Sequence, residues 1–311
     1  MGNFELERSK LIGIPVEKVY ATVRDFQSWP QWSPWLCAEP DCELEFASDG
    51  NHYSWNGRVV GAGEMKVVSE RENEFIEYEL TMTKPWKSVS KVSFQFGREG
   101  ERTRTNWSME GSLPFYLFWM KGMMTSAIGM DYKRGLAMLK DLLQQGAVPS
   151  SLDFKGQGDF AGLSFVGVKR ECRIADISEK MEGDMQRMNK WLQDQHITPS
   201  GSPLSIYHKW SLVQGRTCYT IGFPVEKIPG WLPEDLFAGQ IPACQVQRIV
   251  HTGSYRHLGN AWSAGMAHIR AKTWKVARGI DPFEVYNNDP NSVAEEKLVT
   301  TTHFPMVAGK G

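Results

Sequence analysis

The first half of the chain alternates apolar and polar residues in a succession of short segments. The segment 4–14 alternates along its length and predicts a strand, and apolar residues then recur at helical spacing from 16 to 23. From about 43 to 111, alternating segments separated by turn-forming residues predict successive antiparallel strands. A final segment carries an apolar stripe at helical spacing, formed by Tyr132, Leu136, Leu139 and Leu143. The predicted order is strand, short helices, antiparallel strands and one long closing helix.

The second half contains one order of elements twice. Each copy opens with a strand, continues with an amphipathic helix and ends with two strands. In the first copy these elements are expected at 163–172, 177–192, 203–207 and 218–224, and in the second at 244–251, 255–269, 282–286 and 297–305. Such self-similarity predicts two βαββ units related by a pseudo-two-fold axis, with both helices on one side of a joint antiparallel sheet.

Between the halves, the composition shifts toward glycine, serine and proline. We interpret 147–159 as a linker, which gives one domain at 1–146 and another at 160–311. The length of 311 residues also fits roughly two domains. The expected fold class is α+β in both domains.

The stretch 282–290 offers the clearest candidate chemistry. Because side chains alternate along a strand, Phe283 and Val285 share one face and Glu284 and Tyr286 share the other. The first copy has Ser205 where the second has Glu284, so the fold of the repeat does not require the acid. We therefore take Glu284 as the leading functional residue.

Composition and charge exclude several classes of protein. Apolar residues make up 41% of the chain, and the formal net charge is −1, so no basic surface for nucleic acid is expected. No apolar run is long enough to span a bilayer, and the start of the chain does not resemble a signal peptide. The odd number of scattered cysteines predicts reduced thiols. We expect a cytoplasmic protein.

No cofactor is predicted. The histidines at 251, 257 and 268 lack the spacing of a metal site, and phosphate-binding loops and dinucleotide fingerprints are missing from the sequence.

Three motifs in the first half carry a resemblance to a known superfamily. They are Trp-Pro-x-Trp-x-x-Trp at 29–35, Trp-Ser-Met-Glu-Gly at 107–111 and Asp-x-x-x-Gly-Leu-x-x-Leu-Lys at 131–140. Over about 1–146 the chain resembles the SRPBCC superfamily in its polyketide-cyclase-like, START-like branch. The resemblance implies a helix-grip fold, in which a curved sheet holds a long helix over an apolar cavity. Trp55, Trp86 and Trp107 are candidates to line that cavity or, alternatively, to fill a plain core.

The second half resembles another family over about 160–308. The resemblance rests on the duplicated unit together with His-Thr-Gly-Ser-Tyr at 251–255, Ala261-Trp262 and Glu-x-Tyr-Asn-x-Asp-Pro at 284–290. These features resemble the GyrI-like effector-binding domain of multidrug-responsive transcription activators. The family implies an aromatic cleft at the two-fold axis, with a glutamate that meets cationic ligands, and that role carries over to Glu284. Since no helix-turn-helix segment precedes either domain, direct DNA binding is not expected.

Two functional hypotheses follow. In the first, the protein binds apolar or amphipathic small molecules, which we expect to be cationic, for sensing, sequestration or co-regulation, alone, as a homodimer or with a regulatory protein partner. In the second, it hydrolyses electrophilic small molecules, with Glu284 as general base and Tyr286 assisting proton transfer. The expected walls of the cleft, whose rings would stack on a flat or cationic ligand, are Tyr207, Tyr219, Trp262, Trp274 and Tyr286.

Overall fold

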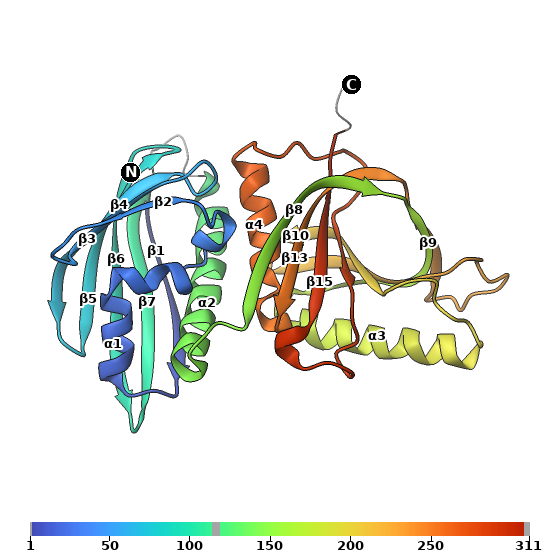
Figure 1. Ribbon diagram of the computed structural model, residues 1–311, viewed down its shortest axis with the longest axis horizontal. Helices are drawn as coiled ribbons and strands as arrows, with labels where there is room; N and C mark the ends of the chain where they lie inside the picture. The colour runs from blue at the N-terminus through green and yellow to red at the C-terminus, as the bar shows by residue number, and fades with distance from the viewer. Residues whose placement is uncertain (1, 114–118, 308–311) are drawn as a thin grey trace. The chain divides into compact units, whose positions relative to one another are not determined.

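The computed structural model describes residues 2–113 and 119–307 (Figure 1). The chain divides into two compact units, and the main division falls between Pro149 and Ser150. Both units combine an antiparallel sheet with helices, which confirms the α+β class. Within the described ranges, no helix has both the length and the apolar character needed to span a bilayer. All five cysteines lie in these ranges, and all are free thiols.

The described part of the first unit forms a 7-stranded sheet in the order β1-β7-β6-β5-β4-β3-β2. The long helix α2 (Lys121–Gln145) packs against β1 and β7, and the short helix α1 (Val16–Arg24) buries the valines of its apolar face. This arrangement confirms the helix-grip prediction. The strands are β1 (Gly2–Ile12), β2 (Glu43–Phe46), β3 (His52–Asn56), β4 (Ala62–Arg71), β5 (Phe75–Lys84), β6 (Ser88–Glu99) and β7 (Arg102–Leu113).

The segment between α1 and the sheet forms two 3-10 helices, η1 (Phe26–Gln31) and η2 (Leu36–Ala38). Pro30 lies inside η1, where it prevents a regular α-helix from continuing. Trp29 and Trp32 are buried, and their rings lie 4.8 Å apart. The aromatic motif at 29–35 therefore builds core.

The described part of the second unit forms an 8-stranded sheet in the order β12-β9-β11-β10-β14-β15-β13-β8. The two repeats occupy opposite halves of this sheet and meet at β10 and β14, as predicted for a pseudo-two-fold. Helix α3 (Ile177–Asp194) belongs to the first repeat and α4 (Gly259–Arg270) to the second. The strands are β8 (Ser150–Phe160), β9 (Leu163–Arg173), β10 (Leu204–Ser211), β11 (Arg216–Pro224), β12 (Phe237–Ile241), β13 (Cys244–Gly253), β14 (Phe283–Tyr286) and β15 (Val299–Pro305).

The linker expected at 147–159 differs from the structure, in which β8 covers most of that range. Strand β8 pairs antiparallel with β13 of the second repeat, and its residues alternate between exposed and partly buried positions. The glycines of β8 obscure this alternation in the sequence, because glycine is also typical of turns. Gly156, with φ of 71°, lies at a bulge in β8, where glycine adopts the left-handed conformation without strain.

The edge strands cross over between the repeats. Strand β8 precedes the first repeat but pairs with β13 of the second, and β12 precedes the second repeat but pairs with β9 of the first. Each edge strand therefore pairs with the repeat that does not directly follow it in the chain.

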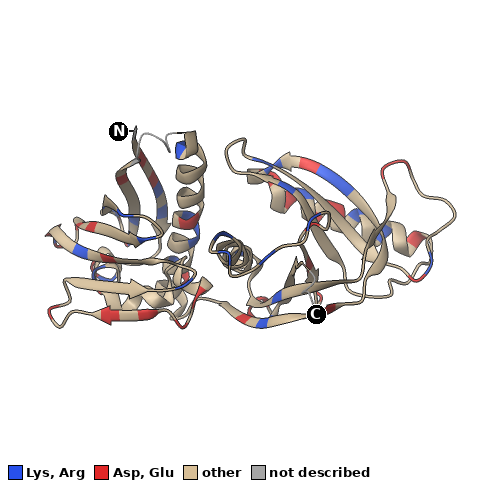
Figure 2. Ribbon diagram, turned by 90° about the horizontal axis from the view of Figure 1, so that it is seen from above, with Lys and Arg blue, Asp and Glu red and all other residues tan. Residues whose placement is uncertain are grey.

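Along the ribbons of both units, positions of Lys and Arg are interspersed with positions of Asp and Glu (Figure 2). This distribution agrees with the net charge of −1.

Candidate functional site

The two central strands of the second sheet bring matching positions of the repeats face to face. In the antiparallel pairing of β10 with β14, Ser205 lies opposite Glu284, and this pair is flanked by Leu204 opposite Val285 and Ile206 opposite Phe283. Equivalent residues pair with one another in this way only where the pseudo-two-fold axis passes between them. Glu284 therefore lies at the axis.

The two faces of these strands have the chemistry that their alternation predicts. Phe283 and Leu204 are fully buried in an apolar cluster on one face. Glu284 and Ser205 point to the other face and are also buried, with Glu284 only 1% exposed. The acid is thus enclosed by protein and does not lie on a solvated edge strand.

Three neutral donors satisfy the Glu284 carboxylate. The hydroxyls of Tyr207 and Tyr286 donate to Oε1 at 3.0 and 2.7 Å, and the indole Nε1–H of Trp262 donates to Oε2 at 2.5 Å. We call these four residues the Glu284 cluster. The register explains the two tyrosines, because Tyr207 and Tyr286 occupy equivalent positions two residues after Ser205 and Glu284.

A further hydrogen bond extends the cluster across the axis. The Ser205 hydroxyl lies 2.8 Å from the hydroxyl of Tyr286. Because Tyr286 gives its only proton to the carboxylate, it accepts from Ser205. The serine of the first repeat thus supports the tyrosine that binds the acid of the second.

Burial dominates the electrostatics of the cluster. Desolvation raises the pKa of Glu284, although its hydrogen bonds with Tyr286, Trp262 and Tyr207 act in the opposite direction. Desolvation and the nearby carboxylate also raise the pKa of both tyrosine hydroxyls well above the usual 10. In the described parts of the chain, no lysine, arginine or histidine forms an ion pair with Glu284.

Aromatic rings from β10, from β14 and from the helical segment of the second repeat lie around the carboxylate. The rings of Tyr207 and Trp262 meet edge to face at 4.7 Å, and those of Tyr255 and Tyr286 at 5.8 Å. From α3, the Met181 sulfur lies 3.7 Å from the Tyr207 hydroxyl. Since α3 and α4 both reach this group, both helices cover the same face of the sheet (Figure 1).

Two of the expected cleft walls, Tyr219 and Trp274, lie next to the Glu284 cluster but are not hydrogen-bonded to its carboxylate. Tyr219 is fully buried in the core beneath α3, where its hydroxyl donates to Asp184 at 2.8 Å. Arg170 binds the same carboxylate with two nitrogens. Trp274 packs on Phe304, with the ring centroids 5.5 Å apart. The structure therefore groups Tyr207, Trp262 and Tyr286 around Glu284. Tyr219 lies opposite Tyr207 in the pairing of β10 with β11, and Trp274 shares its contact with Phe304 with Trp262.

The three tryptophans expected in the first unit have different environments. Trp107 is 1% exposed and stacks on Tyr132 of α2 at 3.8 Å, so it fills the core. Trp55 is partly buried beside Tyr53, at 5.4 Å between ring centroids. Trp86 is 45% exposed. Trp107 belongs to the core cluster of this unit and Trp55 packs against that cluster, whereas Trp86 is not part of it.

Sequence reasoning missed Tyr255 and Asp184. Tyr255 is the first residue of the predicted second helix, so its nearness to the strand that carries Glu284 depends on the tertiary packing. Asp184 lies at a buried position among the methionines of α3, and an acid on an apolar stripe is the signal that would have drawn attention to it.

Comparisons with known proteins match each half of the chain to a family. Residues 3–144 match the family described as polyketide cyclase / dehydrase and lipid transport. Residues 159–307 match the GyrI-like small molecule binding domain. A search of curated proteins found no significant match.

Several solved structures are similar to parts of the chain. The C-terminal domain of EcmrR shares 14% identity over 51% of this chain and 98% of its own, with a TM-score of 0.44. Protein MLL2253 from Mesorhizobium loti shares 14% identity over 46% of this chain and 98% of its own, with a TM-score of 0.37. The Aha1 dimer from Colwellia psychrerythraea shares 17% identity over 46% of this chain and 98% of its own, with a TM-score of 0.35.

The family matches agree with the helix-grip order of the first unit and with the duplicated βαββ units of the second. The chain thus joins a domain of the polyketide cyclase / dehydrase and lipid transport family, at 3–144, to a GyrI-like small molecule binding domain, at 159–307.

Proposed function

We propose that the GyrI-like domain binds amphipathic organic cations and that Glu284 supplies the counter-charge. The observation that carries this proposal is a carboxylate that is 1% exposed and hydrogen-bonded only to neutral donors. A buried charge is costly unless an opposite charge compensates it, and no protein cation in the described ranges does so. A cationic ligand would provide the missing compensation.

The rings of the cluster suit the same class of ligand. The faces of tyrosine and tryptophan attract cations, and each such contact contributes about 0.5–2 kcal/mol. A ligand with an aromatic body would also stack on these rings. Because Tyr207 and Trp262 touch over the carboxylate, entry requires their rings to separate, and the ligand then replaces their mutual contact.

Hydrolysis is the second candidate, because burial raises the pKa of Glu284 toward that of a general base at neutral pH. The proposed partner acid argues against it. The pKa of the Tyr286 hydroxyl is raised well above 10, so this group is a poor proton donor. Binding without turnover is therefore the function that the geometry supports best.

Calorimetric titration with tetraphenylphosphonium and with its neutral relative triphenylphosphine oxide tests the proposal. In Glu284→Gln, the cation should bind about 10- to 100-fold more weakly, because about 1.5–3 kcal/mol of charge-assisted interaction is lost. The neutral compound should bind both proteins equally.

Glu171→Gln serves as the matched control, since Glu171 is an exposed acid of the same domain that pairs with Arg216. It should bind the cation like wild type. Equal cation affinity in wild type and Glu284→Gln would refute the counter-charge role. Incubation with ester substrates, followed by mass spectrometry, tests the hydrolase alternative: product formation that disappears in Glu284→Gln would favour it.

A further inference from the structure

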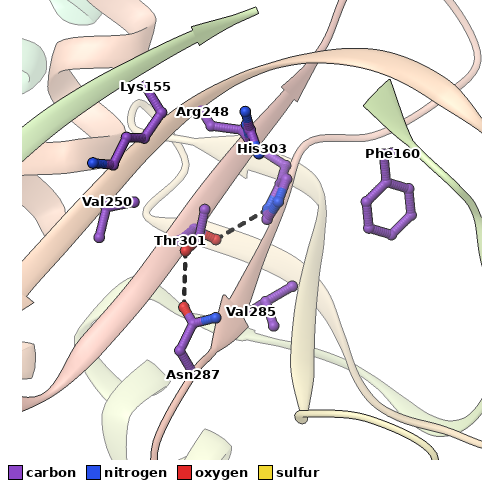
Figure 3. Close-up of a pocket in the computed structure, with 8 residues that line it drawn as sticks. All are labelled: Lys155, Phe160, Arg248, Val250, Val285, Asn287, Thr301 and His303. Atoms are coloured by element: carbon purple, nitrogen blue, oxygen red, sulfur yellow. Dashed lines mark hydrogen bonds between the residues drawn. The ribbon is translucent and has the colours of Figure 1, made fainter. Parts of the chain in front are cut away.

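The opposite face of the same sheet contains a hollow. It has a volume of about 420 Å³, which is in the range of small-molecule sites, and lies on the face of Phe283 and Val285, away from Glu284. Strands β8, β13, β14 and β15 of the second unit contribute to it (Figure 3). Its lining consists of Lys155 and Phe160 from β8, Arg248 and Val250 from β13, Val285 and Asn287 from or next to β14, and Thr301 and His303 from β15.

Arg248 is an uncompensated cation at this hollow. Its Nε is buried without a hydrogen-bond partner, and no acid within the described ranges forms an ion pair with its guanidinium. The side chain lies across Gly158 of β8, where an added Cβ would come within 2.7 Å of Nη2. A glycine at that position thus leaves room for the guanidinium beside the hollow.

The other polar groups at the hollow do not compensate the positive charge of Arg248. Lys155, at the bulge in β8, forms an ion pair with Asp153, so that pair is neutral as a whole. Burial lowers the pKa of His303 to about 4, and its ring stacks on Phe283 at 4.6 Å, so the imidazole is uncharged at neutral pH. Arg248 therefore gives the hollow a net positive charge.

Further groups complete a site of mixed polarity. The amide oxygen of Asn287 accepts a hydrogen bond from the Thr301 hydroxyl at 2.8 Å, which leaves the amide NH₂ as a donor (Figure 3). Phe160, Val250 and Val285 form the apolar part of the lining.

We propose that this hollow binds an organic carboxylate with an apolar body, whose head group pairs with the fork of Arg248 while its body packs on Phe160, Val250 and Val285. The planar guanidinium matches a carboxylate with two parallel hydrogen bonds. The domain then carries two sites of opposite preference on the two faces of one sheet, an acid on one and an arginine on the other.

The test uses 2-naphthoate and its neutral relative 2-naphthamide, titrated by NMR into the full chain. Arg248→Met should weaken naphthoate binding about tenfold or more, because the variant keeps an unbranched stem of apolar character but loses the guanidinium and its charge. Arg248 makes no hydrogen bond through Nε, so this substitution should leave the fold intact. Arg248→Lys should bind with intermediate affinity, since it keeps the charge without the fork.

Two controls separate this site from others. Arg216→Met removes an exposed arginine of the same domain that pairs with Glu171, and it should bind naphthoate like wild type. Glu284→Gln should also leave naphthoate binding unchanged, so the result is independent of the cation site. Gly158→Val should weaken binding while retaining the charge, because its side chain displaces the guanidinium.

Several outcomes would overturn the proposal. They are undetectable naphthoate binding, equal naphthoate affinity in wild type and Arg248→Met, and naphthamide binding as tight as that of naphthoate. Inorganic phosphate that competes fully with naphthoate at equal concentration would also contradict it, because the apolar walls would then contribute nothing.

Discussion

The buried carboxylate at the two-fold axis should make the stability of the unliganded GyrI-like domain depend on pH, and Glu284→Gln should abolish that dependence. Glutamine has nearly the same shape as glutamate. Its amide oxygen can accept from Trp262, and its NH₂ can donate to a tyrosine hydroxyl, so the variant keeps the cluster satisfied. The substitution therefore removes the charge and little else.

The direction follows from the pKa of Glu284, which burial raises above its ordinary 4.5. Below 4.5 the group is protonated in both the folded and the unfolded state. As the pH rises from there toward the folded pKa, the unfolded state loses the proton first, and the free energy of unfolding of wild type falls. One proton gives a slope of at most about 1.4 kcal/mol per pH unit. Above the folded pKa, the difference between wild type and the glutamine variant stays constant.

Differential scanning calorimetry between pH 4 and pH 8 measures this difference. Burial also lowers the pKa of His251 and His303 to about 4, so each destabilises the fold as the pH falls from 6.5 toward 4. These terms are common to both proteins and cancel. The unfolding of the helix-grip domain is an internal control, because Glu284 is not part of it. The free energy of unfolding of wild type minus that of the variant should fall as the pH rises. A difference that is constant over the whole range, or that rises with pH, would refute this prediction.

Two other predictions concern the cluster and the edge of its sheet. Tyr286→Phe should destabilise the domain more than Tyr207→Phe, with each cost about 1–3 kcal/mol, because Tyr286 makes two hydrogen bonds in the cluster and Tyr207 makes one with the carboxylate. Urea unfolding measures both, and equal costs would contradict the assigned network. A fragment of residues 150–311 should fold alone and be more stable than 161–311, which lacks the strand paired with β13. Circular dichroism melts compare the two, and equal melting temperatures would show that β8 contributes little.

Much of the fold could be predicted because local patterns and the fold agree. The alternation of Phe283 and Val285 with Glu284 and Tyr286 places each side chain on the face that the structure has. The repeat also placed Ser205 and Glu284 at equivalent positions, and antiparallel pairing at the axis then sets them opposite each other.

Local patterns in the sequence do not show which distant segments pair in the fold. The sequence predicts a linker where β8 lies, because the partner strand β13 is about 90 residues away and the glycines of β8 resemble turn residues. Tyr219 lies opposite Tyr207 of the Glu284 cluster, but its hydroxyl donates to Asp184 and not to Glu284, and local sequence patterns do not predict that choice of partner. The sequence does not single out Arg248, because whether its charge is compensated depends on which acids lie near it in the fold.

The meeting of Ser205 and Glu284 at the axis has a consequence for how such a domain can evolve. If two identical copies of one repeat associated through these strands, the same residue would stand on both sides of the axis. Two glutamates would then face each other, and their repulsion would force them to share a proton. A site with a single carboxylate at its centre, and no second acid to share a proton with, requires the two copies to differ, and joining them in one chain lets them differ. Duplication within one chain thus allows one glutamate at the axis with a serine opposite it, where two identical subunits would place two glutamates or none.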